Sequence, residues 1–294
     1  MAPGDLVTLP GHVQFGDLLL GPRTTYGWES LTGWEETPAY DSGSVNRSDA
    51  HGAYPGRLLA EPRTITLDGV VIRTEPGRMS TAVRALSAAT ALRDDEQPLV
   101  IKLDDSPPLL SWARCIRRTV PVGTGGYAIG VAIGGAMQFE ASDPRRYDLI
   151  ERVALGRLPS SEPGLGWPLG WPLAFGEPGS TGALSVSNLG DAETHPTIEF
   201  RGPVERPSLT TIETGDTLEY DLPLAAGDVL AVDTRAGTVT LNRTASRLYT
   251  ATARSVPEQT WTLPPGTSTL AFRAAPGSTD PTASVAVRYR SAYW

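Results

Sequence analysis

Apolar and polar residues alternate over short stretches along most of the chain, which is the two-residue period of β-strands. Residues 63–73 and 127–139 show this alternation most clearly. In the second half, apolar stretches recur about every ten residues, and turn sequences such as TGD, AGD and PPG separate them. The chain also holds 31 Gly and 26 Pro, which favour turns over long helices. The pattern therefore predicts a mainly β fold of short strands.

Residues 80–93 depart from this period. They are rich in Ala and Leu, and Met79, Val83, Leu86 and Thr90 follow helical spacing. Ser80 is placed to cap the first turn of such a helix. This is the single helix that we expect.

Two further stretches of the first half predict contacts with other chains. At residues 127–139, large apolar residues (Tyr127, Ile129, Val131, Ile133, Met137 and Phe139) alternate with Gly and Ala (Ala128, Gly130, Ala132, Gly134 and Ala136). We expect the first face to be core and the second to let another backbone approach closely. Residues 37–62 are rich in Gly, Ser, Asp, Pro and Arg, which predicts a long loop that contacts a neighbouring subunit.

The composition divides the chain into a first domain (1–158), a linker (159–183) and a second domain (184–294). The linker contains GWPLGWPLAFG at residues 166–176, where repeated Pro disfavours both a helix interior and a central strand. Trp167 and Trp171 are costly to expose, so we expect this ribbon to pack against a domain or subunit rather than to bind a ligand. The evenly spaced strands of the second domain predict an antiparallel, jelly-roll-like β-sandwich.

Charge and cysteine content narrow the functional classes. A net charge of −8 disfavours general binding to nucleic acid or to anionic membranes. Cys115 is the single cysteine, so it forms no intramolecular disulfide and fits a reducing cytoplasm. We expect neither a secretion signal nor a membrane-inserted segment.

A search for catalytic groups assigns no catalytic, cofactor-binding or metal-binding residue. We therefore expect that the protein is not an enzyme. The candidates each have an ordinary structural interpretation: scattered His12, His51 and His195, a hairpin turn at 123–126, acidic turns at 94–96 and 104–105, and chance or turn sequons at 46–48 and 242–244. Trp261, Tyr220 and Tyr249 could form a platform for stacking a sugar, although aromatic residues on sandwich strands are more often core.

Several motifs, taken in order, resemble those of a distal tail protein of long, flexible-tailed (siphovirus-type) phages. They are RTITLDG at 63–69 before the helix, FEASDPRRY at 139–147, the Trp-Pro ribbon, NLG at 188–190, HPTIEFRG at 195–202, GDVLAVD at 227–233 and AYW at 292–294. Together they span nearly the whole chain.

This resemblance implies a first domain related to tail-tube proteins, with two sheets and one helix, that assembles as a hexameric ring at the tail tip. It also implies a galectin-like sandwich placed around the outside of the ring. Such a protein, assembled in the host cytoplasm, would join the tail tube to tip hub or receptor-binding proteins of the virion. The alternative is a carbohydrate-binding adhesin whose sandwich binds host wall glycans.

Overall fold

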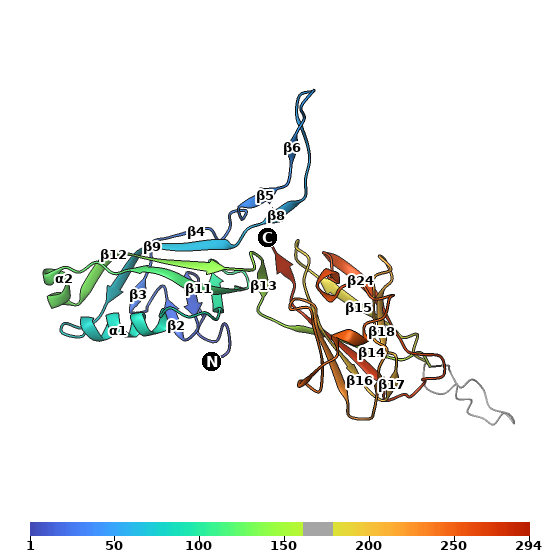
Figure 1. Cartoon of the computed structure of the whole chain (residues 1–294). Coiled ribbons are helices and arrows are strands. Elements are labelled where there is room, and N and C mark those ends of the chain that lie inside the picture. Colours follow the sequence, from blue (N-terminus) through green and yellow to red (C-terminus); the bar gives the residue numbers. More distant parts are fainter. Residues whose placement is uncertain (161–178) are drawn as a thin grey trace. The chain divides into compact units, whose positions relative to one another are not determined.

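The computed structural model describes residues 1–160 and 179–294 (Figure 1). The Trp-Pro ribbon, with Trp167 and Trp171, lies outside the described residues. The chain forms two compact units, of which unit 1 comprises residues 1–149 with Trp294 and unit 2 comprises residues 150–293. Both units are rich in β-structure, so the predicted mainly β fold class is confirmed.

Unit 1 is built on antiparallel strands in the order β2-β1-β10-β11-β12-β9-β3, with β4 also paired to β9 and β13 to β11. The elements are β1 (His12–Phe15), β2 (Leu18–Leu20), β3 (Tyr26–Gly27), β4 (Ser30–Thr32), β5 (Tyr40–Ser42), β6 (Val45–Asn46), β7 (Ala53–Tyr54), β8 (Leu58–Ala60), β9 (Arg63–Arg73), α1 (Met79–Ala89), β10 (Gln97–Lys102), β11 (Leu109–Thr119), α2 (Thr124–Ile129), β12 (Val131–Ala141) and β13 (Arg146–Asp148). Strands β9, β11 and β12 are the longest, and residues 63–68 of β9 and 135–141 of β12 alternate in burial with the predicted period of two.

Helix α1 supplies part of the core of unit 1. Its apolar positions Met79, Ala82 and Leu86 are buried, and the Tyr26 hydroxyl donates a hydrogen bond to the Ala82 carbonyl (2.9 Å). The helix begins one residue earlier than predicted and ends at Ala89. Ser80 is therefore an exposed residue inside the first turn, and the predicted cap is wrong because Arg78 holds the N-cap position without a side-chain bond.

A second, short helix corrects the prediction of a single helix. Residues 124–129 form α2 instead of a hairpin turn followed directly by a strand. The helix ends at Gly130, which adopts the left-handed conformation (φ 80°) that glycine tolerates best. A Cβ on Gly130 would lie 2.2 Å from the Thr74 carbonyl oxygen, so the close approach at this glycine is made by the unit's own backbone.

An irregularity in β12 changes which residues face the core. The pairing of β12 with β9 shifts on both sides of Gly135, and Gly134 has a positive φ of 85°. Before the shift Ala132 is buried and Ile133 is 62% exposed, whereas after it Met137 is buried. The predicted core face is therefore wrong for Ile133, because each extra residue in a bulge reverses the facing of the strand. It is also wrong for Ile129, which lies in α2 rather than in the strand and is 66% exposed.

Unit 2 is an antiparallel sandwich, as predicted. One sheet has the order β14-β25-β16-β21-β22-β23 and the other has β15-β24-β18-β19, with a small β17-β20 pair beside them. The elements are β14 (Arg152–Arg157), β15 (Ala183–Asn188), β16 (Thr197–Arg201), β17 (Val204–Glu205), β18 (Ser208–Thr211), β19 (Thr217–Glu219), β20 (Pro223–Leu224), β21 (Val229–Asp233), β22 (Thr238–Leu241), β23 (Ala245–Ser246), the 3-10 turns η1 (Leu248–Thr250) and η2 (Glu258–Thr260), β24 (Gly266–Arg273), β25 (Ser284–Tyr289) and β26 (Ala292–Tyr293). Phe200, Tyr220 and Phe272 form an aromatic group in its core.

Strand β14 sets the start of unit 2. All six of its residues pair with β25, from Arg152 with Tyr289 to Arg157 with Ser284. The structural division therefore lies before β14, whereas the division drawn from composition placed residues 150–158 in the first domain. Composition carries no signal here, because the partner strand lies more than a hundred residues away in sequence.

Candidate functional site

Residues 40–60 form a hairpin that extends away from the main sheet of unit 1 (Figure 1). We call this hairpin the arm. Its strands pair in two short ribbons, β5 with β8 and β6 with β7. The prediction of an irregular loop at 37–62 is therefore wrong. The two strands of the hairpin pair through backbone hydrogen bonds, which the polar sequence did not indicate.

The arm exposes large apolar side chains to solvent. Tyr40, Val45, Tyr54, Leu58 and Leu59 are 55–65% exposed. A two-stranded hairpin has no second layer to cover it and is marginally stable in water on its own. Its edges also leave backbone groups free to pair with another chain. The arm is therefore a candidate assembly surface.

A buried arginine fixes the base of the arm. Arg63, the first residue of β9, is 2% exposed. Its Nη1 donates to the carbonyls of Gly33 (3.0 Å), Trp34 (3.0 Å) and Glu36 (2.8 Å), and its Nε donates to the carbonyl of Pro144 (2.7 Å). One side chain therefore joins the segment that enters the arm to the strand that leaves it. We call this set of bonds the Arg63 clamp.

Charged side chains near the Arg63 clamp also hold the segment that leads into the arm. Burial, with a contribution from nearby Arg146, lowers the pKa of Arg63 to about 10, so its guanidinium stays protonated at neutral pH. Arg146 forms an ion pair with Glu35 (2.9 Å) and lies over the ring of Trp34 (5.6 Å). The arm consequently starts from a rigid base.

A second apolar surface lies around α2. It is a hollow of about 370 Å³ lined only by Gly, Ala, Pro, Val and Ile of residues 121–133. Val122, Ile129 and Ile133 border it and are 62–78% exposed. We call this surface the tip pocket. It lacks charged lining residues, so an apolar segment is the occupant that it fits.

A third apolar surface lies on unit 2. Ile150, Val153 and Leu155 are 71%, 45% and 74% exposed. Val153 and Leu155 belong to β14, which has a strand neighbour on one side in its sheet. An edge strand with apolar residues on its open face is a typical site of protein contact.

The side chains most suited to metal binding or nucleophilic chemistry are the three histidines and Cys115. His12 is buried, with Nδ1 accepting from the backbone N–H of Thr8 (3.2 Å) and Leu9 (3.3 Å). His51 is exposed on the arm and His195 lies in unit 2, so the three histidines do not meet within a unit. Burial raises the pKa of the Cys115 thiol, which disfavours the reactive thiolate. Among the described residues, no group of three or more His, Cys, Asp or Glu could hold a metal ion.

The acidic turns behave as turn residues. Asp104 accepts the backbone N–H of Ser106 (2.7 Å), and this bond is the main reason that its pKa is lowered. Glu96 accepts the backbone N–H of Ser142 (2.7 Å). Glu96 therefore ties its turn to the segment after β12, and both carboxylates have a structural role.

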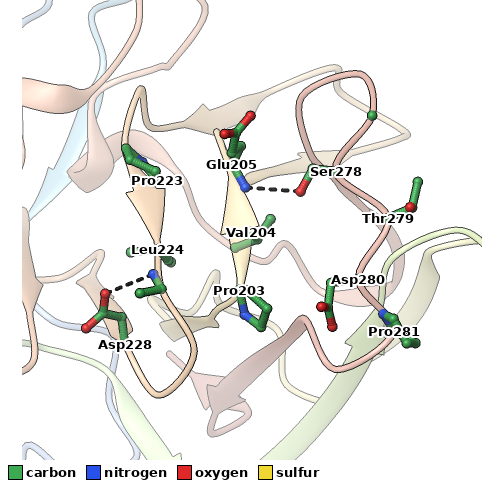
Figure 2. Close-up of a pocket in the computed structure, with 12 residues that line it drawn as sticks. Pro203, Val204, Glu205, Pro223, Leu224, Asp228, Ser278, Thr279, Asp280 and Pro281 are labelled. Atoms are coloured by element: carbon green, nitrogen blue, oxygen red, sulfur yellow. Dashed lines mark hydrogen bonds between the residues drawn. The ribbon is translucent and has the colours of Figure 1, made fainter.

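A wide hollow of about 710 Å³ in unit 2 was not expected from the sequence (Figure 2). Strands β17 and β20 form one side of it and the loop at 277–281 forms the other. Two of its three carboxylates have partners of their own, since Asp228 accepts from the side chain of Asn242 and Asp280 accepts from Thr282, which lowers the pKa of each. Ser278 accepts the backbone N–H of Glu205 (3.1 Å). These bonds indicate turn geometry rather than a ligand site.

The proposed sugar platform of three aromatic residues is not formed. Trp261 is 1% exposed and Tyr220 is fully buried, as expected for core residues. Tyr249 alone is exposed, at 78%. The three therefore do not share a surface.

Comparisons with known proteins agree with this fold. Residues 189–293 match the family model of the siphovirus-type tail component, C-terminal domain. No curated protein matches the sequence. Among solved structures, the Dit protein of phage SPP1, described as a paradigm of the hub adsorption apparatus in phages that infect Gram-positive bacteria, is similar with a TM-score of 0.63 and 13% identity, over 95% of this chain and 97% of that one.

The phage P2 baseplate in its activated conformation, with calcium or with strontium, contains a chain that is also similar. The TM-score is 0.50 and the identity 8%, over 90% of this chain and 91% of that one. At such low identities the likeness establishes the fold. By sequence over residues 189–293 and by fold over nearly its whole length, the chain has the resemblance to siphovirus-type distal tail proteins that its motifs indicated.

Proposed function

We propose that this protein is a structural component of a phage tail tip that forms a homo-hexameric ring and joins the tail tube to host-binding tip proteins. Unit 1 carries assembly in this proposal, and unit 2 lies around the outside. The number six, the location in the virion and assembly in the host cytoplasm rest on the likeness to distal tail proteins. Neither catalysis nor a cofactor is part of the proposal.

The arm is the observation that carries the proposal. It presents five exposed apolar side chains on a base that the Arg63 clamp makes rigid. The tip pocket is a separate apolar surface of the same unit. Two different surfaces on one subunit support head-to-tail contacts, which close into a ring when the rotation between neighbours allows it.

The remaining surfaces support contacts with other tail proteins. The β14 surface of unit 2 is a candidate for tip hub or receptor-binding proteins. The net charge of −8 gives no support to nucleic-acid binding. No helix in the described parts of the chain is long and apolar enough to span a membrane.

Light scattering of the purified protein tests the proposal. We expect a species of about 187 kDa, six copies of the 31.2 kDa chain, at micromolar concentration. The double variant Tyr54→Ser, Leu58→Ser should shift the mass to that of the monomer, because it removes apolar contact from the arm. Leu92→Ser is the matched control, since Leu92 is 87% exposed but lies outside the three surfaces.

Two outcomes contradict the proposal. One is a parent protein that stays monomeric at micromolar concentration and gives no ring in electron micrographs of virions. The other is a ring that forms equally well from the arm variant and from Leu92→Ser, which would leave the arm without a role in assembly.

A further inference from the structure

A pocket in unit 2 combines one exposed aromatic ring with two pairs of charged side chains. It is a hollow of about 520 Å³ bordered by Arg206, Glu219, Asp221 and residues 249–254. Tyr249 lies in η1, and Glu219 is the last residue of β19. No motif in the sequence brought these residues together.

Backbone bonds hold the two sides of the pocket in place. The Asp221 N–H donates to the carbonyl of Thr250 (2.8 Å), and the Thr252 N–H donates to the carbonyl of Glu219 (2.9 Å). Between these bonds lies Tyr220, whose side chain is fully buried and packs edge-on against a core phenylalanine. The pocket is therefore anchored to the sandwich core and needs little ordering to receive a ligand.

The ring of Tyr249 is the apolar part of the pocket. The side chain is 78% exposed, and within the described chain its hydroxyl has no hydrogen-bond partner. An aromatic ring left in water at the border of a fixed pocket offers a flat apolar face and a free polar group to a ligand. Ala251 and Ala253 are the other apolar residues there, so the pocket lacks the broad apolar lining that a protein segment would bury.

The charged groups are paired with one another. Arg206 donates through Nε (3.1 Å) and Nη2 (3.0 Å) to the same oxygen, Oδ1, of Asp221. Arg254 donates to Oε2 of Glu219 (3.1 Å), and the Thr252 hydroxyl donates to its Oε1 (3.0 Å). Two positive and two negative groups give the pocket no net charge, while the second oxygen of Asp221 can still accept hydrogen bonds.

This arrangement selects among classes of ligand. A phosphate or an acidic polymer would face two carboxylates, and a cationic ligand would face two guanidinium groups, so neither charge is favoured. A neutral ligand with one apolar face and an edge of hydroxyl groups satisfies both the tyrosine ring and the paired charges. Sugar rings have this chemistry.

We propose that the Tyr249 pocket binds a neutral saccharide, with a sugar ring stacked on Tyr249 and its hydroxyls bonded to the Arg206–Asp221 pair and to Arg254. The site differs from the three-residue platform considered from the sequence, because Trp261 and Tyr220 are core residues. The proposal does not depend on ring assembly.

Saturation-transfer NMR on the full-length protein tests the proposal. The probes are the methyl glycosides of glucose, galactose, rhamnose and N-acetylglucosamine, with ribitol phosphate as an anionic probe. We expect transfer to ring protons of at least one neutral glycoside and none to ribitol phosphate. Tyr249→Ala should weaken that affinity about tenfold through loss of stacking, and Asp221→Asn should weaken it as well.

Ile212→Ala is the matched control, because Ile212 is an exposed apolar residue of unit 2 outside the pocket, and its truncation should leave sugar binding unchanged. Circular dichroism melts would show that each variant remains folded. Absence of transfer from every neutral glycoside, equal transfer in the parent and Tyr249→Ala, or transfer from ribitol phosphate alone would each overturn the proposal. Loss of a tail-protein contact in Tyr249→Ala without any sugar binding would assign the pocket to a protein partner instead.

Discussion

The arm of unit 1 and the sandwich of unit 2 place the same kinds of side chain in opposite environments. Tyr40 and Tyr54 of the arm are each 61% exposed, whereas Tyr220 and Trp261 of the sandwich are buried. Both regions are antiparallel β-structure of short strands. The difference is that two sheets cover each other in the sandwich, while the paired strands of the arm have no covering layer.

This comparison shows which apolar residues stabilise the folded chain and which remain available for association. An apolar residue contributes to folding when a second layer removes it from water, and contributes to association when the covering layer belongs to another chain. Substitutions in the sandwich core should therefore lower the free energy of unfolding, and substitutions on the arm should leave it nearly unchanged. Four predictions test this contrast.

Trp261→Ala should have the largest effect. Trp261 is 1% exposed, and its Nε1 donates to the carbonyl of Asp216 (3.3 Å). Truncation of a core aromatic leaves a cavity, so we expect the free energy of unfolding to fall by about 3–5 kcal/mol in denaturant titrations. The exposed Tyr249→Ala should change it by no more than about 0.5 kcal/mol. Similar losses in both variants would remove the contrast between buried and exposed rings.

Arg63→Met should come next, although Arg63 belongs to the unit that carries the arm. The substitution keeps a long side chain but leaves the carbonyls of Gly33, Trp34, Glu36 and Pro144 without their donor. We expect a loss of about 3 kcal/mol in the free energy of unfolding of unit 1. Arg57→Met, at an exposed position of the arm, is the control and should have little effect. An equal effect of the two substitutions would contradict the clamp.

Tyr220→Phe should show a smaller effect that depends on pH. Burial, and then the proximity of Glu258, raises the pKa of Tyr220 above its ordinary value, so the folded state favours the neutral phenol. The associated stability is complete below about pH 10, the pKa in the unfolded chain, and is lost as pH rises above it, by up to about 1.4 kcal/mol per pH unit.

At pH 7 the phenylalanine variant lacks the hydrogen bond from Tyr220 to Glu258 (3.1 Å), which costs about 1 kcal/mol. The difference between parent and variant should shrink above pH 10, because the variant has no phenol to ionise. A difference that stays constant from pH 7 to pH 11 in denaturant titrations would show that Tyr220 does not titrate with unfolding.

The arm double variant Tyr54→Ser, Leu58→Ser should have the smallest effect on folding. Both side chains are more than 60% exposed in the single chain, so we expect a change in the free energy of unfolding within about 0.5 kcal/mol for the monomer. Thermal melts at a concentration where the parent is monomeric would measure it. A loss of several kcal/mol would mean that the arm stabilises its own unit and is not held ready for a partner.

Much of the fold could be predicted from local pattern, and the exceptions have identifiable causes. The spacing of Met79, Val83 and Leu86 predicted α1, because helical spacing is a local property of the sequence. Ile133 was misplaced because a bulge beside Gly135 reversed the facing of β12, and one strand's sequence does not reveal a shift that occurs between two strands. The arm was predicted to be a loop because residues 37–62 contain few apolar residues, so the sequence shows no strand-like alternation there.

The candidate site was predicted only in part. Composition singled out residues 37–62, and their contact with a neighbouring subunit stays a prediction, whereas the Arg63 clamp was missed. Arg63 shares the buried face of β9 with Ile65 and Leu67, and a charged residue at a core position in a period of two was the available signal. Its four partners lie on segments far from it in sequence, so no local pattern identifies them.

The sequence by itself determined the mainly β class, the first helix, the sandwich and the resemblance to siphovirus-type tail proteins, because periodicity, turn residues and motif order are properties of short segments. Only the tertiary structure decided that β14 belongs to unit 2, that Trp261 is buried while Tyr249 is exposed, and that Arg63 closes the base of the arm. Each of these depends on which distant strand or carbonyl lies next to a residue. Contacts of that kind are set when the whole chain packs, since burial is a property of the surroundings and not of the residue.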